Sequence, residues 1–302
     1  MGVVGKAFYH YGYFAASRPC TAIFIGLVIN AVAMVGVINW QSTADPQKLW
    51  VPPASRANVE QSYFAKEFGF FFRINTGWIT PLHEDQADHD IFDKPYLSLL
   101  YELQLAIETG IAHINGLTVD FNEFCYKPIS GQGCLVESPM QYWKMNETAM
   151  LNDTSVKVTS QCIPPEDATE RICFDRIGTP VLTYAIFGGM SCEPGTKGEC
   201  DACQIKASGM QITLLLTNNI YSLNTAEEWE RQVYIRNIKS FNYALGNGYH
   251  TDMSGPMKGI SYNMDLVEKL QAVKAKYPDM IDVKADYLAE RSIEDNIVLE
   301  GK

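Results

Sequence analysis

The sequence predicts an α+β protein, a split sandwich with helices on one face of a sheet, preceded by one transmembrane helix. A charge-free apolar run covers residues 20–38. Beyond it, β-favouring segments occur at 70–80, 212–216 and 280–295, and residues 96–114 show helical periodicity between the first two. Strand–helix, followed later by strand–strand–helix–strand, is the element order of a split α+β domain.

The composition indicates a folded, acidic protein. Of 302 residues, 47 % are apolar, which is ample for a core, and the formal net charge is -11. A nucleic-acid surface needs patches of Lys and Arg that neutralise phosphates, and the sequence contains no such patch. We therefore expect no nucleic-acid partner.

The apolar run is long enough to cross a membrane. From Cys20 to Ile38 it contains no charged residue, and at about 1.5 Å per residue it covers roughly 28 Å of a hydrocarbon core of about 30 Å. Lys6 and Arg18 precede it, so the positive-inside rule predicts a cytosolic N-terminus at 1–19 and a transmembrane helix at 20–41. A cleaved signal peptide is the alternative, although its apolar region is usually shorter.

A connector, 42–69, is expected to join this helix to the main domain, 70–302. The pair Pro52-Pro53 stiffens its first half, and a helix is predicted at 57–68. One side of that helix consists of Val59, Tyr63 and Phe64. We expect the helix to lie along the base of the domain. The aromatic residues expected to pack into the core next to it are Phe68, Phe70, Phe71 and Phe72.

Further elements are predicted in the main domain. Leu100, Leu103, Ile107 and Ile111 recur at helical spacing within 96–114. Residues 181–189 are predicted to form a strand, and the unbroken apolar run at 212–216 indicates a strand buried on both faces. A capping box at Thr225 opens a helix. Its inner stripe consists of Trp229, Val233, Tyr234, Ile238 and Phe241.

Cysteines and sequons predict an oxidising compartment. Seven of the eight cysteines lie between residues 125 and 203. The predicted pairs are Cys125 with Cys134 and Cys162 with Cys173, which close loops of about ten residues. Cys192, Cys200 and Cys203 leave one thiol over, and the sequence does not say which. Asn146 and Asn152 begin Asn-x-Thr sequons and are candidate glycosylation sites.

Several dispersed segments resemble the Niemann–Pick type C1 family, whose relatives include Patched and the RND permeases. These segments are "DPQKLW" at 45–50, "SRANVEQSYFAKEFGFFFRI" at 55–74, "LQLAIE" at 103–108, "NNIYSLNTAEEWE" at 218–230 and "AERSIED" at 289–295. The resemblance covers the first transmembrane helix and the middle lumenal domain. It implies a ferredoxin-like, RND porter-like fold in an endosomal or lysosomal membrane, with the main domain in the lumen.

The resemblance also implies a function, which is intracellular cholesterol transfer. In this family the middle lumenal domain docks a soluble sterol carrier, the Niemann–Pick type C2 protein, through two loops at its outer end. The resemblance places the second loop at 218–224, where Asn219, Ile220, Tyr221 and Leu223 would contact the carrier. The alternative is a helix-entry staple, in which Leu223 packs on Trp229 or its neighbours. We expect this chain, which lacks the family's sterol-binding and sterol-sensing parts, to form no transport pathway alone.

The first docking loop is placed at 82–94, where this sequence departs from the family pattern. "LHEDQADHD" is short and acidic, which puts a contact through Leu82 and His83 in doubt. We expect His83 and His89 to gain charge in an acidic lumen and so to tune docking. A cation site among the carboxylates is the alternative, but no fixed ligand spacing supports it. A solvated acidic loop is the favoured interpretation.

Two other classes of protein, a receptor and a thiol oxidoreductase, are alternatives. A single-pass, Patched-like receptor or adhesion ectodomain that binds a protein ligand is the main alternative. Cys200-Asp-Ala-Cys203 has the spacing of a thiol oxidoreductase, yet its surroundings favour a loop and a structural disulfide. The sequence shows no nucleophile elbow, phosphate loop or zinc-binding histidine pair. We therefore expect neither catalysis nor a cofactor.

Overall fold

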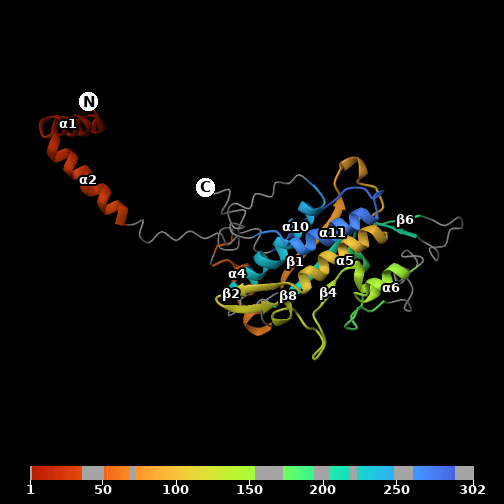
Figure 1. Ribbon diagram of the computed structural model, residues 1–302. Coiled ribbons are helices and arrows are strands. Elements are labelled where there is room, and N and C mark those ends of the chain that lie inside the picture. The colour runs from red at the N-terminus through yellow and green to blue at the C-terminus, as the bar shows by residue number, and fades with distance from the viewer. Residues whose placement is uncertain are drawn as a thin grey trace. The chain divides into compact units, whose positions relative to one another are not determined.

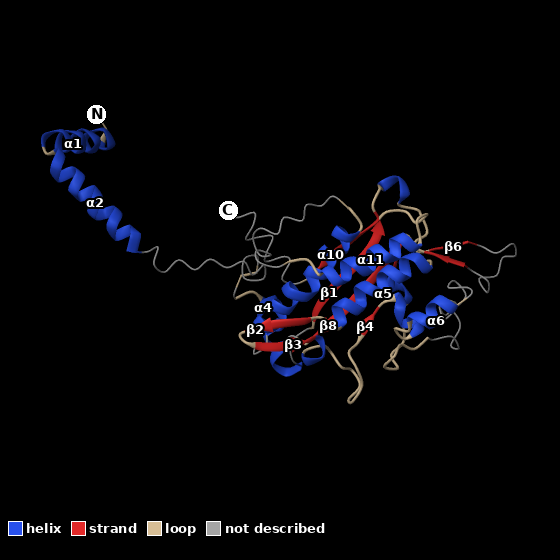
Figure 2. Cartoon of the chain, viewed as in Figure 1, coloured by secondary structure: helices blue, strands red, loops and turns tan. Residues whose placement is uncertain are grey.

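The computed structural model divides the chain into two compact units, 1–50 and 51–302, each of which is described by itself. The described residues are 2–35, 51–52, 54–68, 72–153, 173–193, 204–217, 223–247 and 261–289. Figure 1 traces the chain by residue number, and Figure 2 separates helices from strands.

The first unit contains two helices, α1 (Val3–Ser17) and α2 (Pro19–Val35). The sequence predicted a cytosolic segment and one transmembrane helix here, and α1 was not foreseen. Among the described residues, no helix taken singly has the length and apolar character needed to cross a bilayer. Val4–Ser17 and Pro19–Met34 meet that test only together, and a bend of 110° separates them. Part of the predicted helix, 36–41, lies outside the described residues.

An antiparallel sheet organises the second unit. Its four main strands are β1 (Arg73–Pro81), β4 (Val136–Glu137), β8 (Gly209–Leu216) and β9 (Val283–Leu288). They are hydrogen-bonded in the order β4-β8-β1-β9, and β5 (Phe187–Gly188) pairs with β8. The predicted α+β class is confirmed.

The register of the sheet fixes its two ends. Arg73 faces Leu216, Ile79 faces Met210, and Pro81 faces Val283. We call the end formed by the start of β1, the end of β8 and the end of β9 the near end. The far end is formed by the end of β1, the start of β8 and the start of β9.

Helices form one layer over the sheet (Figures 1 and 2). They are α5 (Lys94–Glu108), α9 (Leu223–Trp229), a π-helix (Glu230–Ile235), α10 (Arg236–Ala244) and α11 (Met264–Lys276). α11 packs against α5 and α10, and α10 packs against β9. The predicted stripe from Trp229 to Phe241 is buried throughout. Burial of these large side chains stabilises the layer against the sheet.

Smaller elements complete the unit. They are α4 (Arg56–Phe68), η2 (Glu84–Gln86), β2 (Ile111–Ile114), β3 (Leu117–Asp120), η3 (Phe121–Glu123), η4 (Pro139–Trp143), α6 (Glu147–Asn152), α8 (Thr183–Ile186), β6 (Ser191–Glu193) and β7 (Gln204–Lys206). β2 pairs with β3 and β6 pairs with β7, each as a separate two-stranded sheet.

The helix predicted at 96–114 is shorter than expected. α5 ends at Glu108, and Ile111 lies exposed in β2. Gly110 follows the C-cap Thr109 and allows a close approach, because a Cβ there would lie 2.8 Å from the Ala106 carbonyl oxygen and would collide with Val233. Asn115 and Gly116 then adopt positive φ angles, which suit the tight turn between β2 and β3.

Two strand predictions also change. In 181–189 the chain forms α8 first, and only Phe187 and Gly188 pair with β8. β8 itself is present, but its burial alternates, and Thr213 and Leu215 are only half-buried. The prediction that both of its faces are buried is therefore wrong, since the helices cover one face of the sheet.

The connector differs from the prediction in its packing. α4 forms as expected, but its apolar side is exposed: Val59 at 59 %, Tyr63 at 64 % and Phe64 at 38 %. Phe72 is 40 % exposed and its ring contacts that of Tyr126 at a tilt of 44°, with centroids 4.2 Å apart, so it is not a core residue. The side chain of Phe68 and residues 70 and 71 lie outside the described set.

Candidate partner-binding surface

The described residues next to the two predicted docking segments lie at opposite ends of the sheet. Leu82 and His83 directly follow β1 and so occupy the far end, where Leu82 N donates to Asp282 O at 2.8 Å. Thr217 directly follows Leu216, which faces Arg73 at the near end. The docking role of both segments therefore stays a prediction, and only the positions of these flanking residues are described. Asn219, Ile220 and Tyr221 lie outside the described residues, as does the side chain of Leu223.

The far-end segment, 82–93, is anchored at its return to the domain. Ile91 N donates to Ala207 O at 2.8 Å. The Asp90 carboxylate accepts hydrogen bonds from the backbone N–H groups of Phe92 and Ala207, both at 3.1 Å. These bonds tie the segment to the residues that precede β8.

Buried apolar and aromatic residues also stabilise the far end. Ile91 and Phe92 are fully buried, and the Phe92 ring lies 4.5 Å from that of Phe187. The Tyr96 hydroxyl accepts from Ile281 N at 3.0 Å, which joins the first turn of α5 to the chain entering β9. Burial raises the pKa of Tyr96, so the hydroxyl stays protonated at neutral pH.

The exposed part of this segment is acidic. His83, Glu84, Asp85, Asp88 and His89 are all exposed, whereas Leu82 is half-buried. No group of three metal-ligating side chains occurs among the described residues, which include this segment in full. The far end thus presents carboxylates and two titratable histidines to solvent on a fixed backbone.

A buried ionic cluster lies at the near end and was not predicted from the sequence. Arg73 donates to both carboxylate oxygens of Glu230, each at 3.0 Å, and Asn75 donates to the same carboxylate at 3.2 Å. The Glu227 carboxylate lies 3.9 Å from Arg73. A signal existed in the sequence, because Glu230 interrupts the apolar stripe that begins at Trp229.

The π-helix that carries Glu230 lies close to β1. A Cβ on Gly77 would lie 3.0 Å from the Tyr234 hydroxyl oxygen and 3.2 Å from Ile238 Cδ1, so glycine permits this approach. Burial, together with the charge of Glu230, holds the pKa of Tyr234 well above its usual range. Single π turns in helices often occur at functional sites, but this one points into the core.

Cysteine and sequon predictions have mixed outcomes. The disulfide between Cys125 and Cys134 is confirmed, with Cα atoms 5.5 Å apart. Cys173 is also disulfide-bonded, while its predicted partner Cys162 lies outside the described residues. Cys200, Cys203 and the side chain of Cys192 lie outside them too. The sequon residues Asn146 and Asn152 are both exposed, one capping α6 and the other ending it.

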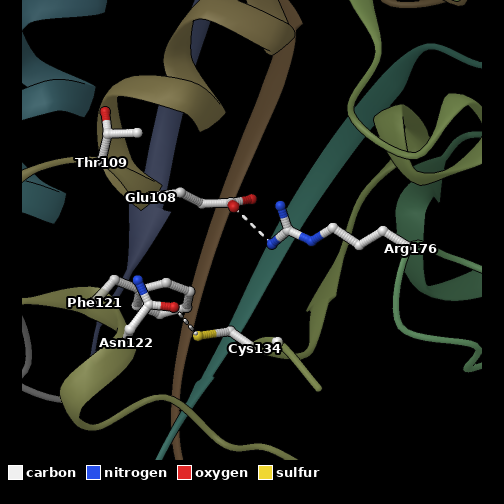
Figure 3. A pocket seen from close by; sticks show the side chains of 7 residues that line it. Glu108, Thr109, Phe121, Asn122, Cys134 and Arg176 are labelled. Carbon is white, nitrogen blue, oxygen red and sulfur yellow. Dashed lines mark hydrogen bonds and ion pairs between the residues drawn. The ribbon is translucent and has the colours of Figure 1, made fainter. Parts of the chain in front are cut away.

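A pocket of about 350 Å³ lies next to this disulfide (Figure 3). Arg176 reaches across it to Glu108, with Nη2 2.6 Å from the carboxylate, and Gln104 donates to Glu108 at 2.7 Å. The remaining lining includes Asn122 and Cys134. Since the carboxylate is paired and the sulfur is oxidised, the pocket offers neither a free base nor a nucleophile.

Comparison with known proteins identifies the family. The family described as NPC1, middle luminal domain, matches residues 61–251. The chain belongs to the NPC1 family. That match covers most of the second unit, including β1, α5, β8 and α10. The predicted family membership is confirmed.

Relatives within the NPC1 family are named as cholesterol transporters. The NPC1-like intracellular cholesterol transporter 1 of Mus musculus is 27 % identical over 292 residues, 83 % of this chain and 21 % of the relative. The Homo sapiens protein of the same name is 27 % identical over 226 residues, 62 % of this chain and 16 % of the relative. In Drosophila melanogaster, the NPC intracellular cholesterol transporter 1 homolog 1b is 25 % identical over 78 % of this chain and 21 % of the relative. The chain spans about a fifth of the length of these curated relatives.

Proposed function

We propose that this chain is the lumenal domain of a membrane-anchored sterol transporter and docks a soluble, Niemann–Pick C2-type sterol carrier. The observation that carries the proposal is the family match over residues 61–251, together with relatives named as intracellular cholesterol transporters. It acts as a receiving platform rather than as an enzyme, in keeping with the names of those relatives.

The strand order supports a ferredoxin-like arrangement of the porter type. α5 connects β1 to β4, and the helices from α9 to α11 connect β8 to β9, so each connection passes over one strand of the sheet. Such a rigid α+β unit is a suitable scaffold for a docking loop. In this proposal α2 anchors the unit in an endosomal or lysosomal membrane, with residues 51–302 on the lumenal side.

The far end is the proposed docking surface. Leu82 and His83 lie there on a segment held by Asp90 and Asp282. Its carboxylates favour a carrier with a basic surface.

Retention of a purified, sterol-loaded carrier by the full chain tests this proposal. Leu82→Ala with His83→Ala should weaken retention, while Ile220→Ala with Tyr221→Ala should leave it unchanged. The opposite result would indicate that the carrier docks on residues 218–224 instead. A wild-type chain that retains no carrier would overturn the proposal and favour a Patched-like receptor.

A further inference from the structure

The pocket next to the disulfide is formed by four parts of the chain (Figure 3). Glu108 comes from the last turn of α5 and Asn122 from η3, while Gly133 lies in the loop before β4. Arg176 lies on a turn that precedes α8. The volume of about 350 Å³ is near the lower limit of the roughly 300–1,000 Å³ of ligand pockets. Most of the lining is charged or polar, so the pocket suits a small polar ligand.

The carboxylate of Glu108 is fixed from the interior of the domain. Gln104 is fully buried and donates from Nε2 to Glu108 Oε1 at 2.7 Å. The Oε1 atom of Gln104 accepts from the buried Ser138 hydroxyl at 2.6 Å, so the orientation of the Gln104 amide is determined. The Glu108 side chain is only 11 % exposed. Because water hydrates it poorly, its charge depends on donors within the pocket.

Arg176 reaches the pocket from a hydrogen-bonded turn. The Asp175 carboxylate accepts from Ile177 N at 2.9 Å and from Thr179 N at 2.8 Å. It also accepts from the Thr179 hydroxyl at 2.6 Å. Gly178 has a φ of 86°, which closes the turn, and the side chain of Ile177 is buried. The backbone that carries the guanidinium is therefore positioned before any ligand arrives.

The ion pair across the pocket leaves hydrogen-bond donors unused. Arg176 meets Glu108 through Nη2 at 2.6 Å, and its Nε and Nη1 donate to no described residue. The Asn122 amide places Oδ1 3.3 Å from Cys134 Sγ, and Figure 3 shows its nitrogen on the side away from that sulfur. This nitrogen also donates to no residue in the described ranges. A carboxylate is the acceptor that a guanidinium binds most strongly.

The charges of the pocket select the class of ligand. An anion bound to Arg176 would also face the carboxylate of Glu108, and a cation bound to Glu108 would face the guanidinium. A zwitterion avoids both repulsions and leaves the existing ion pair intact. We propose that the pocket binds a free α-amino acid, whose carboxylate accepts from Arg176 and Asn122 and whose ammonium donates to Glu108.

This inference does not depend on the proposed function. Cys125, which is bonded to the pocket residue Cys134, pairs with Leu216 at the near end of the sheet. The proposed docking surface lies at the far end. The pocket and the docking surface can therefore be tested separately.

Saturation-transfer difference NMR of the full chain in detergent tests the inference. L-Alanine carries both charged groups, N-acetyl-L-alanine carries only the carboxylate, and L-alaninamide carries only the ammonium. All three have the same side-chain methyl group, which reports transfer from the protein. We expect severalfold stronger transfer to L-alanine than to either of the other two. Equal transfer to all three, or no transfer to L-alanine, would overturn the inference.

Variants show whether the transfer comes from this pocket. Arg176→Gln and Glu108→Gln each remove one charge and should lower transfer to L-alanine severalfold. Gly133→Leu should fill the pocket and have the same effect while the ion pair remains, since a Cβ at this position meets only Ile177 Cγ2, at 3.4 Å. Arg56→Gln, which removes an exposed ion pair outside the pocket, should leave transfer unchanged.

Urea unfolding followed by tryptophan fluorescence shows which variants fold. If a charge variant does not fold, Gly133→Leu decides the test. Undiminished transfer in folded Arg176→Gln or in Gly133→Leu would overturn the inference. An equal loss in Arg56→Gln would do so as well, because the signal would then not depend on the pocket.

Discussion

Replacing Arg73 by methionine should leave Glu230 buried without its cation. Arg73 is 4 % exposed and Glu230 is 0 % exposed, and two hydrogen bonds of 3.0 Å join them. Removing one partner of such a pair costs about 3–5 kcal/mol of stability, since the remaining charge cannot be hydrated. The free energy of unfolding of such domains is only about 5–15 kcal/mol, so the variant should lose a large share of its stability.

The double variant Arg73→Met with Glu230→Met should be less damaging than either single change. Two apolar side chains of similar volume fill the site, and no buried charge remains. Asn75 still loses the acceptor that it contacts at 3.2 Å, which costs about 1–3 kcal/mol. We therefore expect a coupling of at least about 2 kcal/mol between the two positions.

Urea unfolding of the full chain in detergent, followed by tryptophan fluorescence, measures these differences. Arg56→Met is the matched control, because Arg56 pairs with Glu60 at 2.6 Å but is 90 % exposed, and such pairs contribute less than about 1 kcal/mol. If Arg73→Met costs no more than this control, or if the two single costs simply add, the argument from burial is refuted.

Three other changes have defined outcomes. Replacing both Cys125 and Cys134 by serine opens a loop of about ten residues and should lower the free energy of unfolding by about 2.5–3 kcal/mol. Gly77→Ala should cost about 1–3 kcal/mol, while Gly133→Ala, where a Cβ has ordinary contacts only, should cost far less. Burial raises the pKa of Tyr142 to about 12, above its usual value. The contribution of the protonated Tyr142 to the free energy of unfolding is complete below about pH 10 and is lost as the pH rises towards 12.

Each of these expectations has a measurement that can contradict it. Equal unfolding midpoints of the wild type with and without reductant would contradict the prediction that the disulfide stabilises the fold. Equal stability of the alanine variants at 77 and 133 would show that the helix layer shifts freely. An absorbance titration of tyrosinate in Tyr142→Phe should lack one step near pH 12, and an unchanged curve would contradict the assignment.

The sequence predicted those elements whose apolar periodicity is long and regular. The stripe from Trp229 to Phe241 is present and buried as expected. The element order also predicted the α+β class, because strands and helices alternate with few long interruptions. Propensity and periodicity thus sufficed wherever one face of an element meets the core.

Local periodicity failed where a single contact decides the outcome. Ile111 continues the spacing of α5, yet the helix ends at Glu108, and next to its end Val233 leaves no room for a side chain at Gly110. The sequence also could not predict at which end of the sheet Leu82 and Thr217 lie, since this follows from the pairing of Arg73 with Leu216. Strand register is a long-range property that the pattern of one segment does not contain.

The adjacency of β1 and β9 has a mechanical consequence. Thr76 faces Leu288 in an antiparallel pair, so a pull on both chain ends of the domain would act at one side of this ladder. The hydrogen bonds between the two strands would then break one after another. Force applied at opposite ends of the two strands would instead load all of these bonds at once. Force on these two strand ends would therefore separate β1 from β9 at the near end first and at the far end last.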